Sequence, residues 1–178
     1  MKSVAGKYLF LFAIAGLIVA LDQWTKGLVR ANLALGETWL PHSLAWLSPY
    51  ARIVHWYNMG AAFGMFQNGS MVFTVLAIIV ISAIIYYFPR VDRHDWTLRI
   101  AMSMQLAGAA GNLIDRLTQG GRVTDFISVG TFPVFNIADA SISTGTAILL
   151  LGVYLQERAA LKMKARGEAN HTSEATSE

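Results

Sequence analysis

Residues 71–88 read MVFTVLAIIVISAIIYYF, a run without a single charged side chain. An α-helix of this length is long enough to cross the hydrocarbon core of a bilayer. The composition agrees, because 54% of the 178 residues are hydrophobic and only 14% are charged, whereas soluble domains carry about 25% charged residues. The sequence therefore predicts an integral membrane protein.

Three shorter uncharged runs surround this one, at 8–21, 100–114 and 140–156. Each becomes long enough to span a bilayer if it is extended past one aspartate, which puts Asp22, Asp115 and Asp139 at the ends of helices. We expect an all-α integral membrane protein with a single domain at 1–157 and a polar cytoplasmic tail at 158–178, where the last helix frays into disorder. The expected transmembrane helices are 8–27, 70–88, 98–116 and 138–157.

Lysine and arginine predict the orientation of these helices. With both termini in the cytoplasm, nine of the 14 basic side chains face inward and five face outward. The first run could also be a cleaved signal peptide, because Lys2 and Lys7 precede its apolar core. We favour a retained helix, because the polar cluster at 22–26 continues it and three more runs follow.

The segment between the first two helices is rich in tryptophan, tyrosine and proline over residues 36–57. Such aromatic residues favour the membrane interface, and the alternation over 52–57 predicts a short strand or hairpin. We expect this small β-containing segment on the extracytoplasmic side.

Several functions are disfavoured by what the sequence lacks. The absence of cysteine excludes a disulfide framework, a thiolate nucleophile and a thiolate metal site. The four histidines lie outside the apolar runs, and no nucleotide-binding motif occurs, so zinc proteolysis and nucleotide chemistry are disfavoured. The basic residues are scattered between apolar runs, so we expect no nucleic-acid partner.

Four carboxylates gather at the predicted outer level, where Asp125 lies in a loop near the three helix-end aspartates. An ionisable group at membrane depth is costly and suggests a functional site. Asp22 and Lys26 share a helix face, and their pairing could be structural or functional. For Asp115 we favour an ion pair with Arg116 that fixes the loop.

Asp125 and Asp139 have no cation in their own short segments. Two such carboxyl groups in a partly dry place would share a proton, as an acid and base pair requires. The alternative is that both are loop or helix-cap residues that face solvent. A proton-coupled carrier or a membrane scaffold are rival functions, but the clustering of polar residues at one end favours an enzyme.

Five blocks of sequence, in this order, are similar to the signature blocks of bacterial lipoprotein signal peptidase, the type II signal peptidase family. They are LDQWTK (21–26), NMGAAFG (58–64), GAAGNLIDR (108–116), VTDFI (123–127) and FPVFNIAD (132–139). The resemblance covers about residues 8–157. It departs from the family at Ala107, at Thr124 and in a short loop over 126–135.

The resemblance implies an aspartic endopeptidase of the bacterial inner membrane that cuts prolipoproteins before a diacylglyceryl-modified cysteine. It places the catalytic pair on Asp125 and Asp139, facing the extracytoplasmic side. It implies a monomer without metal or organic cofactor, whose partners are diacylglyceryl-prolipoprotein substrates and membrane lipid. The supporting or substrate-binding residues would be Asp22, Lys26, Asn58, Gly60, Gly108, Asn112, Asp115, Arg116, Asn136 and Ala138.

Overall fold

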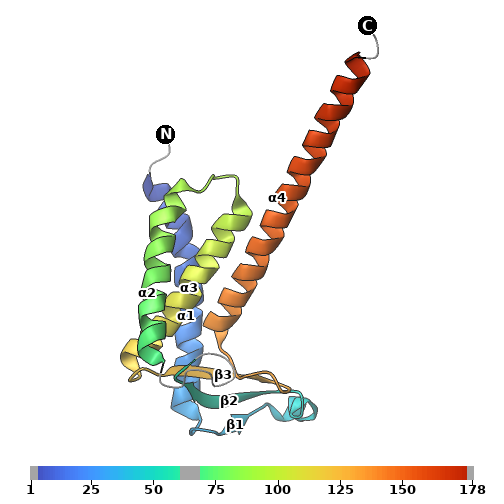
Figure 1. The fold of residues 1–178 in the computed structure, drawn as a ribbon. Helices are drawn as coiled ribbons and strands as arrows, with labels where there is room; N and C mark the ends of the chain where they lie inside the picture. Colours follow the sequence, from blue (N-terminus) through green and yellow to red (C-terminus); the bar gives the residue numbers. More distant parts are fainter. Residues whose placement is uncertain (1–3, 61–68, 176–178) are drawn as a thin grey trace.

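The computed structural model of the protein describes residues 4–60 and 69–175. Its long helices stand side by side, and a small sheet lies across one end of them (Figure 1). The helices are α1 (Val4–Asn32), α2 (Ser70–Tyr87), α3 (Trp96–Thr118) and α4 (Ile137–Ala175). Stretches long and apolar enough to span a membrane occur in three of them, at Tyr8–Asn32, Ser70–Arg90 and Ile137–Arg158. The chain is therefore an integral membrane protein.

Helix α3 is the central helix and contacts α1, α2 and α4. It falls outside the three apolar stretches because it carries several polar residues, but most of these point inward. Arg99, Asn112 and Asp115 are all buried. Polar side chains are therefore buried in part of the interior, where they do not face lipid.

Apolar packing holds the other end of the bundle together. A buried cluster joins α1, the end of α2 and α3 through Leu11, Ala15, Ile84, Phe88, Leu106 and Ala107. Large apolar side chains such as Leu17 and Val72 face outward and stay exposed. We attribute their exposure to contact with lipid tails, since burial against lipid satisfies them as well as burial in protein.

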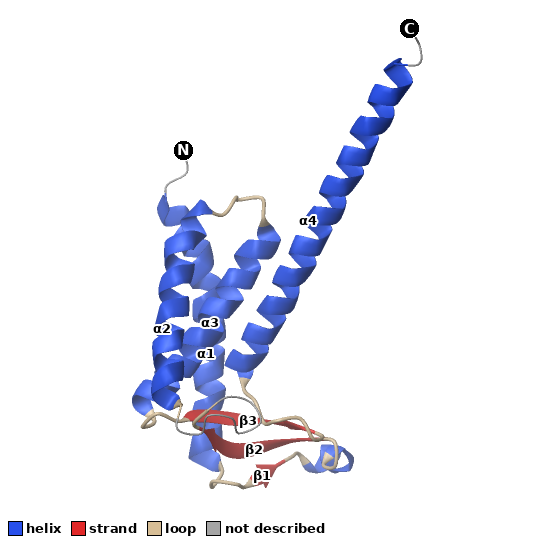
Figure 2. Cartoon of the chain, in the orientation of Figure 1, coloured by secondary structure: helices blue, strands red, loops and turns tan. Residues whose placement is uncertain are grey.

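The sheet contains three antiparallel strands in the order β1-β2-β3 (Figure 2). The bounds are Thr38–Trp39 for β1, Ala51–Asn58 for β2 and Val123–Val129 for β3. Strands β1 and β2 confirm the expected β-containing segment between the first two helices. Strand β3 was not expected, and it comes from the segment between α3 and α4. A short 3-10 helix, η1 (His42–Leu47), separates β1 from β2.

Helix α4 does not end near residue 157, as the loss of the apolar face had suggested. It continues to Ala175, for 39 residues in all, and extends well beyond the other helices (Figure 1). The expectation of a frayed tail was wrong because lysine, arginine, glutamate and alanine are all good helix formers. A polar composition ends the apolar face of a helix without ending the helix itself.

A glycine allows the first turns of α4 to pack closely on α3. A methyl group at Gly108 would overlap the carbonyl oxygen of Ala138 and the side chain of Ile142. The first of these is backbone and cannot rotate away. The role that the sequence indicated for Gly108 is therefore one of close packing beside the first turn of α4.

We predict that Gly108→Ala lowers the stability of the detergent-solubilised protein by about 1–3 kcal/mol, because the added methyl group forces α4 away from α3. Gly16→Ala is the matched control, since nothing lies within 4 Å of its added methyl group. That substitution should be neutral or stabilising by up to about 1 kcal/mol. Thermal unfolding of both variants is the measurement, and equal midpoints would contradict the prediction.

Candidate active site

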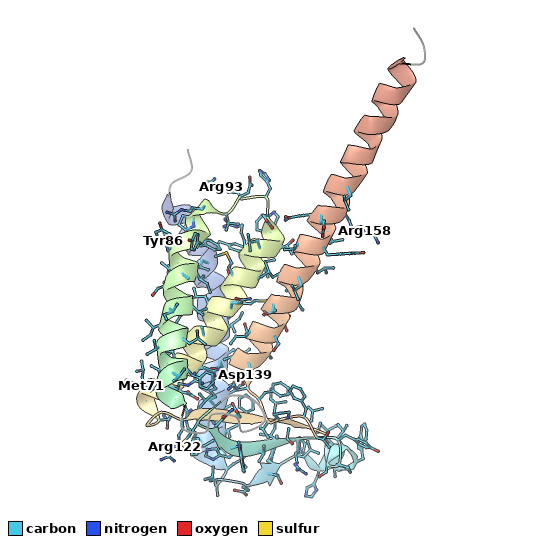
Figure 3. All side chains as sticks on the ribbon, viewed as in Figure 1. Met71, Tyr86, Arg93, Arg122, Asp139 and Arg158 are labelled. Atoms are coloured by element: carbon cyan, nitrogen blue, oxygen red, sulfur yellow. The ribbon has the colours of Figure 1, made fainter. Side chains whose placement is uncertain are left out.

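The polar residues singled out in the sequence come together where the helices meet the sheet. Asp139 lies at that end of the bundle, whereas Arg93 and Arg158 lie toward the other end (Figure 3). Residue Asp125 comes from β3, and Asp139 comes from the first turn of α4. Strand β3 pairs with β2, and Asp125 lies opposite Trp56 in that register.

A buried lysine forms the base of the site. The Nζ atom of Lys26 lies 2.9 Å from Oδ2 of Asp22 and 3.4 Å from Oδ2 of Asp115. It also donates a hydrogen bond of 3.1 Å to Oδ1 of Asn112. The side chains of Lys26, Asp22 and Asp115 are fully buried. The predicted pairing of Asp22 with Lys26 is confirmed, and it extends from α1 to α3.

The two aspartates of this ion network also fix the backbone of neighbouring elements. Oδ1 of Asp22 accepts a 3.0 Å hydrogen bond from the backbone N–H of Ala138, at the start of α4. Oδ2 of Asp115 accepts a 2.8 Å bond from the backbone N–H of Thr124 in β3. The residues adjacent to Asp125 and Asp139 in sequence are thus attached to one buried ion network.

The expected ion pair between Asp115 and Arg116 is wrong. Asp115 pairs with Lys26 and, at 3.5 Å, with Nη1 of Arg30. Adjacent residues of a helix point about 100° apart, so a carboxylate and its immediate neighbour do not face one another. The guanidinium carbon of Arg116 instead lies 5.5 Å from the ring centroid of Phe73. Its Nε is buried without a hydrogen-bond partner among the described residues.

Asn136 connects the two carboxyl groups. Its Nδ2 donates a 2.6 Å hydrogen bond to Oδ1 of Asp125. Its backbone N–H donates to Oδ2 of Asp139 over 3.2 Å, and its Oδ1 accepts from the backbone N–H of Asp139 over 2.9 Å. This reciprocal pair of bonds is a capping box at the start of α4. One oxygen of Asp139 thus takes part in a helix cap, but Asp125 is buried and does not face solvent as the alternative required.

Two further amides hold the remaining oxygens of the carboxyl groups. Nδ2 of Asn58 donates a 3.1 Å bond to Oδ2 of Asp125. Nδ2 of Asn112 donates a 2.7 Å bond to Oδ1 of Asp139. Asn112 also accepts a hydrogen bond from the ammonium group of Lys26, so one amide links Lys26 to Asp139. All four carboxyl oxygens of Asp125 and Asp139 are thereby fixed.

Asp125 and Asp139 line the same cavity, which has a volume of about 650 Å³. Arg116, Asn112, Asn58 and Gly60 share its polar part. The rest of the wall is mainly apolar and includes Phe73, Leu76, Ala77 and Val80 of α2, Ala109 of α3 and Ile142 of α4. Asp22, Lys26 and Asp115 do not line it. The structure thus separates a buried ion network from an open pair of carboxyl groups.

Asp125 has an unusual protonation state. Burial, and to a lesser extent the nearby charge of Asp139, raises the pKa of its carboxyl group to about 7. Hydrogen bonds from Asn58 and Asn136 and the charge of Lys26 act in the opposite direction. Asp125 therefore keeps its proton at neutral pH more readily than an ordinary aspartate does.

Three residues of the site were not predicted from the sequence to be functional, namely Gln23, Arg30 and Thr124. Nε2 of Gln23 donates to Asp22, to Asp115 and to the carbonyl of Gly111. Nη1 of Arg30 bonds to Oγ1 of Thr124 over 2.9 Å. The spacing of Arg30, four residues after Lys26 on α1, was a signal for a shared face. Thr124, noted only as a departure from the family pattern, supplies the hydroxyl group that this arginine uses.

The remaining sequence candidates have smaller roles. The backbone N–H of Gly60 donates a 2.9 Å bond to Oδ1 of Asn58, which orients that amide toward Asp125. Residues 61–64 of the NMGAAFG block lie outside the described residues. Among the described residues, no group of three or more histidine, cysteine, aspartate or glutamate side chains could hold a metal ion.

Comparisons with known proteins agree on one family. Residues 14–155 match the family model of signal peptidase (SPase) II. The chain is 36% identical over 157 residues to the lipoprotein signal peptidase of Halalkalibacterium halodurans, covering 86% of this chain and 97% of that protein. It is 38% identical to the lipoprotein signal peptidase of Brevibacillus brevis, covering 81% of this chain and 94% of that protein.

The fold is also similar to solved structures. A bacterial membrane enzyme determined by the in meso method at 2.3 Å resolution matches with a TM-score of 0.73 and 30% identity. The match covers 83% of this chain and 88% of that enzyme. A family model that spans most of the chain and relatives that are covered almost completely lead to the same conclusion. The chain belongs to the signal peptidase II family.

Proposed function

We propose that Asp125 and Asp139 are the catalytic pair with which this peptidase removes the signal peptide from diacylglyceryl-modified prolipoproteins, cutting before the lipidated cysteine. The reaction class follows from the family. The observation that carries the assignment is the placement of the two carboxyl groups on one cavity, with Asn136 bonded to both. Asp22 and Asp115 are neutralised by Lys26 and Arg30 together and do not line the cavity.

The pair divides the roles of base and acid. Asp139 accepts bonds from Asn112 and from a helix N-terminus, both of which stabilise a carboxylate. Asp125, whose pKa is raised to about 7, is protonated in a large fraction of the molecules at neutral pH and serves as the acid. A water between them gives a proton to Asp139 and attacks the scissile carbonyl carbon. Asp125 then protonates the departing nitrogen as the tetrahedral intermediate collapses, without a covalent bond to the enzyme.

Arg116 and the amides position the substrate and the pair. The side chain of Arg116 lines the cavity, where a peptide carbonyl of the substrate can accept a hydrogen bond from the guanidinium. Asn58 and Asn136 prevent Asp125 from turning away from the cavity. The substrate's acyl chains and apolar signal peptide fit the wall formed by Phe73, Leu76, Ala77 and Val80.

The proposal extends to the position of the enzyme in the membrane. Helix α3 has 23 residues, or about 34 Å at 1.5 Å per residue, so it serves as a fourth spanning helix. Its polar residues are shielded by the other three helices. Arg93 and Arg158 lie toward the end opposite Asp139 (Figure 3), and the predominance of basic residues there supports a cytoplasmic location for that end and for both termini. The enzyme then acts as a monomer at the outer face of the inner membrane.

We predict that Asp125→Asn and Asp139→Asn each lower the cleavage rate of a diacylglyceryl-modified prolipoprotein by roughly 100- to 10,000-fold, because each removes an acid or base. Asp92→Asn is the control, since Asp92 is exposed and lies in the loop before α3. Purified variants should unfold at temperatures near that of the wild type. A folded Asp125→Asn or Asp139→Asn enzyme that cuts at the wild-type rate would rule out the pair.

We predict that kcat/KM falls about tenfold per pH unit above pH 7. The raised pKa of Asp125 means that the protonated acid is present below about pH 7 and is lost as the pH rises through that value. Initial cleavage rates across this range provide the measurement. A rate that instead rises through pH 7 and stays high would show that an ionised Asp125 acts as the base.

We predict that the sheet and the loop before α3 lie on opposite sides of the membrane. The chain has no cysteine, so single cysteines can be introduced at the exposed residues Ser43 and His94. A membrane-impermeant maleimide added to spheroplasts should label Ser43→Cys, and it should label His94→Cys only after lysis. The reverse pattern would show the opposite orientation, and labelling of both in intact spheroplasts would contradict the single spanning helix, α2, between them.

A further inference from the structure

The wall that α4 contributes to the cavity carries two hydroxyl groups, on Ser143 and Thr144. We infer that these two hydroxyls form a subsite for the ester carbonyls of the substrate's diacylglyceryl group. This inference rests on the proposed function and assigns the recognition of the lipid to named atoms of the site.

Most serine and threonine hydroxyls of the helices have a hydrogen bond, and of the described exceptions Ser143 and Thr144 line the cavity, whereas Ser82 of α2 and Thr97 of α3 do not. Within the transmembrane helices, serine and threonine usually donate to a backbone carbonyl one turn earlier. On α4, Thr146 donates to the carbonyl of Ile142 over 2.9 Å, and Ser141 donates to that of Met104 over 2.7 Å. Thr25, Thr74, Ser103 and Thr118 of the other helices also donate to carbonyls of their own helix.

The side chains of Ser143 and Thr144 are exposed. Neither hydroxyl group has a hydrogen bond within the described part of the chain. Their exposed side faces a cavity lined by Leu76, Val80 and Ile142. A hydroxyl group without a partner costs free energy in such surroundings. A ligand that offers acceptors at this depth is therefore favoured over one that is apolar throughout.

The depth of the two hydroxyls matches the position of the esters. Ser143 follows Asp139 by four residues, so it lies on the same face of α4 and about 6 Å further from the helix start. In the substrate, the scissile bond joins the cysteine nitrogen, and the thioether and glycerol carbons separate that nitrogen from the two ester groups. A cysteine nitrogen at Asp125 and Asp139 therefore brings the esters down to the level of Ser143 and Thr144.

The esters are a better match than the signal peptide. A helical signal peptide satisfies its own backbone carbonyls, so it needs no donors from the enzyme at this depth. Ester carbonyls only accept hydrogen bonds, and the lipid provides no donor for them. Two hydroxyl donors and two ester acceptors are therefore complementary, while the acyl chains beyond them lie along the apolar residues of α2.

The test compares two synthetic substrates that differ only in the lipid linkage. One peptide carries the diacylglyceryl group, and the other carries a dialkylglyceryl group whose ether oxygens replace the esters and lack the carbonyls. We expect the wild-type enzyme to show a KM roughly 20-fold higher for the ether substrate, from two hydrogen bonds of about fivefold each. The value of kcat should change little, because the esters lie away from the reacting atoms.

The variants Ser143→Ala and Thr144→Val should each raise KM about fivefold for the ester substrate, and the double variant should bind both substrates equally. Thr146→Val is the matched control, because its hydroxyl lies on the same helix, is bonded to Ile142 and does not line the cavity. It should keep the full preference for the ester. The single variants keep the test valid if the double variant fails to fold.

Two results would overturn the subsite. One is a wild-type enzyme that binds ester and ether substrates equally, and the other is a preference for the ester that stays at its full wild-type size in both single variants. Either result would leave the catalytic pair intact, because the enzyme would still cut. Failure of the proposed function is a different outcome, in which the Asp125 and Asp139 variants cut both substrates as fast as the wild type.

Discussion

The structure depends on one buried ammonium group. Lys26 has no contact with solvent, and its charge is balanced by Asp22 on its own helix and by Asp115 on α3. Removing one partner of a buried ion network leaves an uncompensated charge and costs about 3–5 kcal/mol. The main role of the ion network is to position the catalytic candidates. Asp115 and Asp22 bind the backbone N–H groups of the residues next to Asp125 and Asp139.

Asn136 links the two carboxyl groups of the proposed catalytic pair. One residue caps α4, bonds to Asp139 at two backbone positions and reaches across to Asp125. The distance between the two carboxyl groups is therefore determined by a single amide and by the place where a helix begins. The cavity in front of them combines this polar end with an apolar wall of α2, so lipid and peptide can be held by one surface.

Much of this arrangement could be predicted from the sequence. The apolar runs locate the helices, and the aspartates at their ends identify a common depth. The pairing of Asp22 with Lys26 follows from helix periodicity alone. Other features depend on contacts between distant segments. The β-branched and aromatic residues of VTDFISV favour a strand, but strand β3 forms by pairing with β2, a segment distant in the sequence. Asp115 was paired with the wrong arginine because neighbours in sequence diverge on a helix, whereas Arg30 approaches from α1.

The ion network also constrains how the protein is made. Helix α1 carries its own counter-ion, since Asp22 and Lys26 are adjacent on one face and can enter the bilayer as a pair. Helix α3 brings Asp115, whose cationic partners both belong to α1. A ribosome completes α1 long before α3, so the cations are already in place when the anion arrives. Asp115 makes it costly for α3 to enter lipid alone, so α3 enters favourably when it packs beside α1. The positions of the charges on these two helices therefore favour an order of assembly in which α1 comes first.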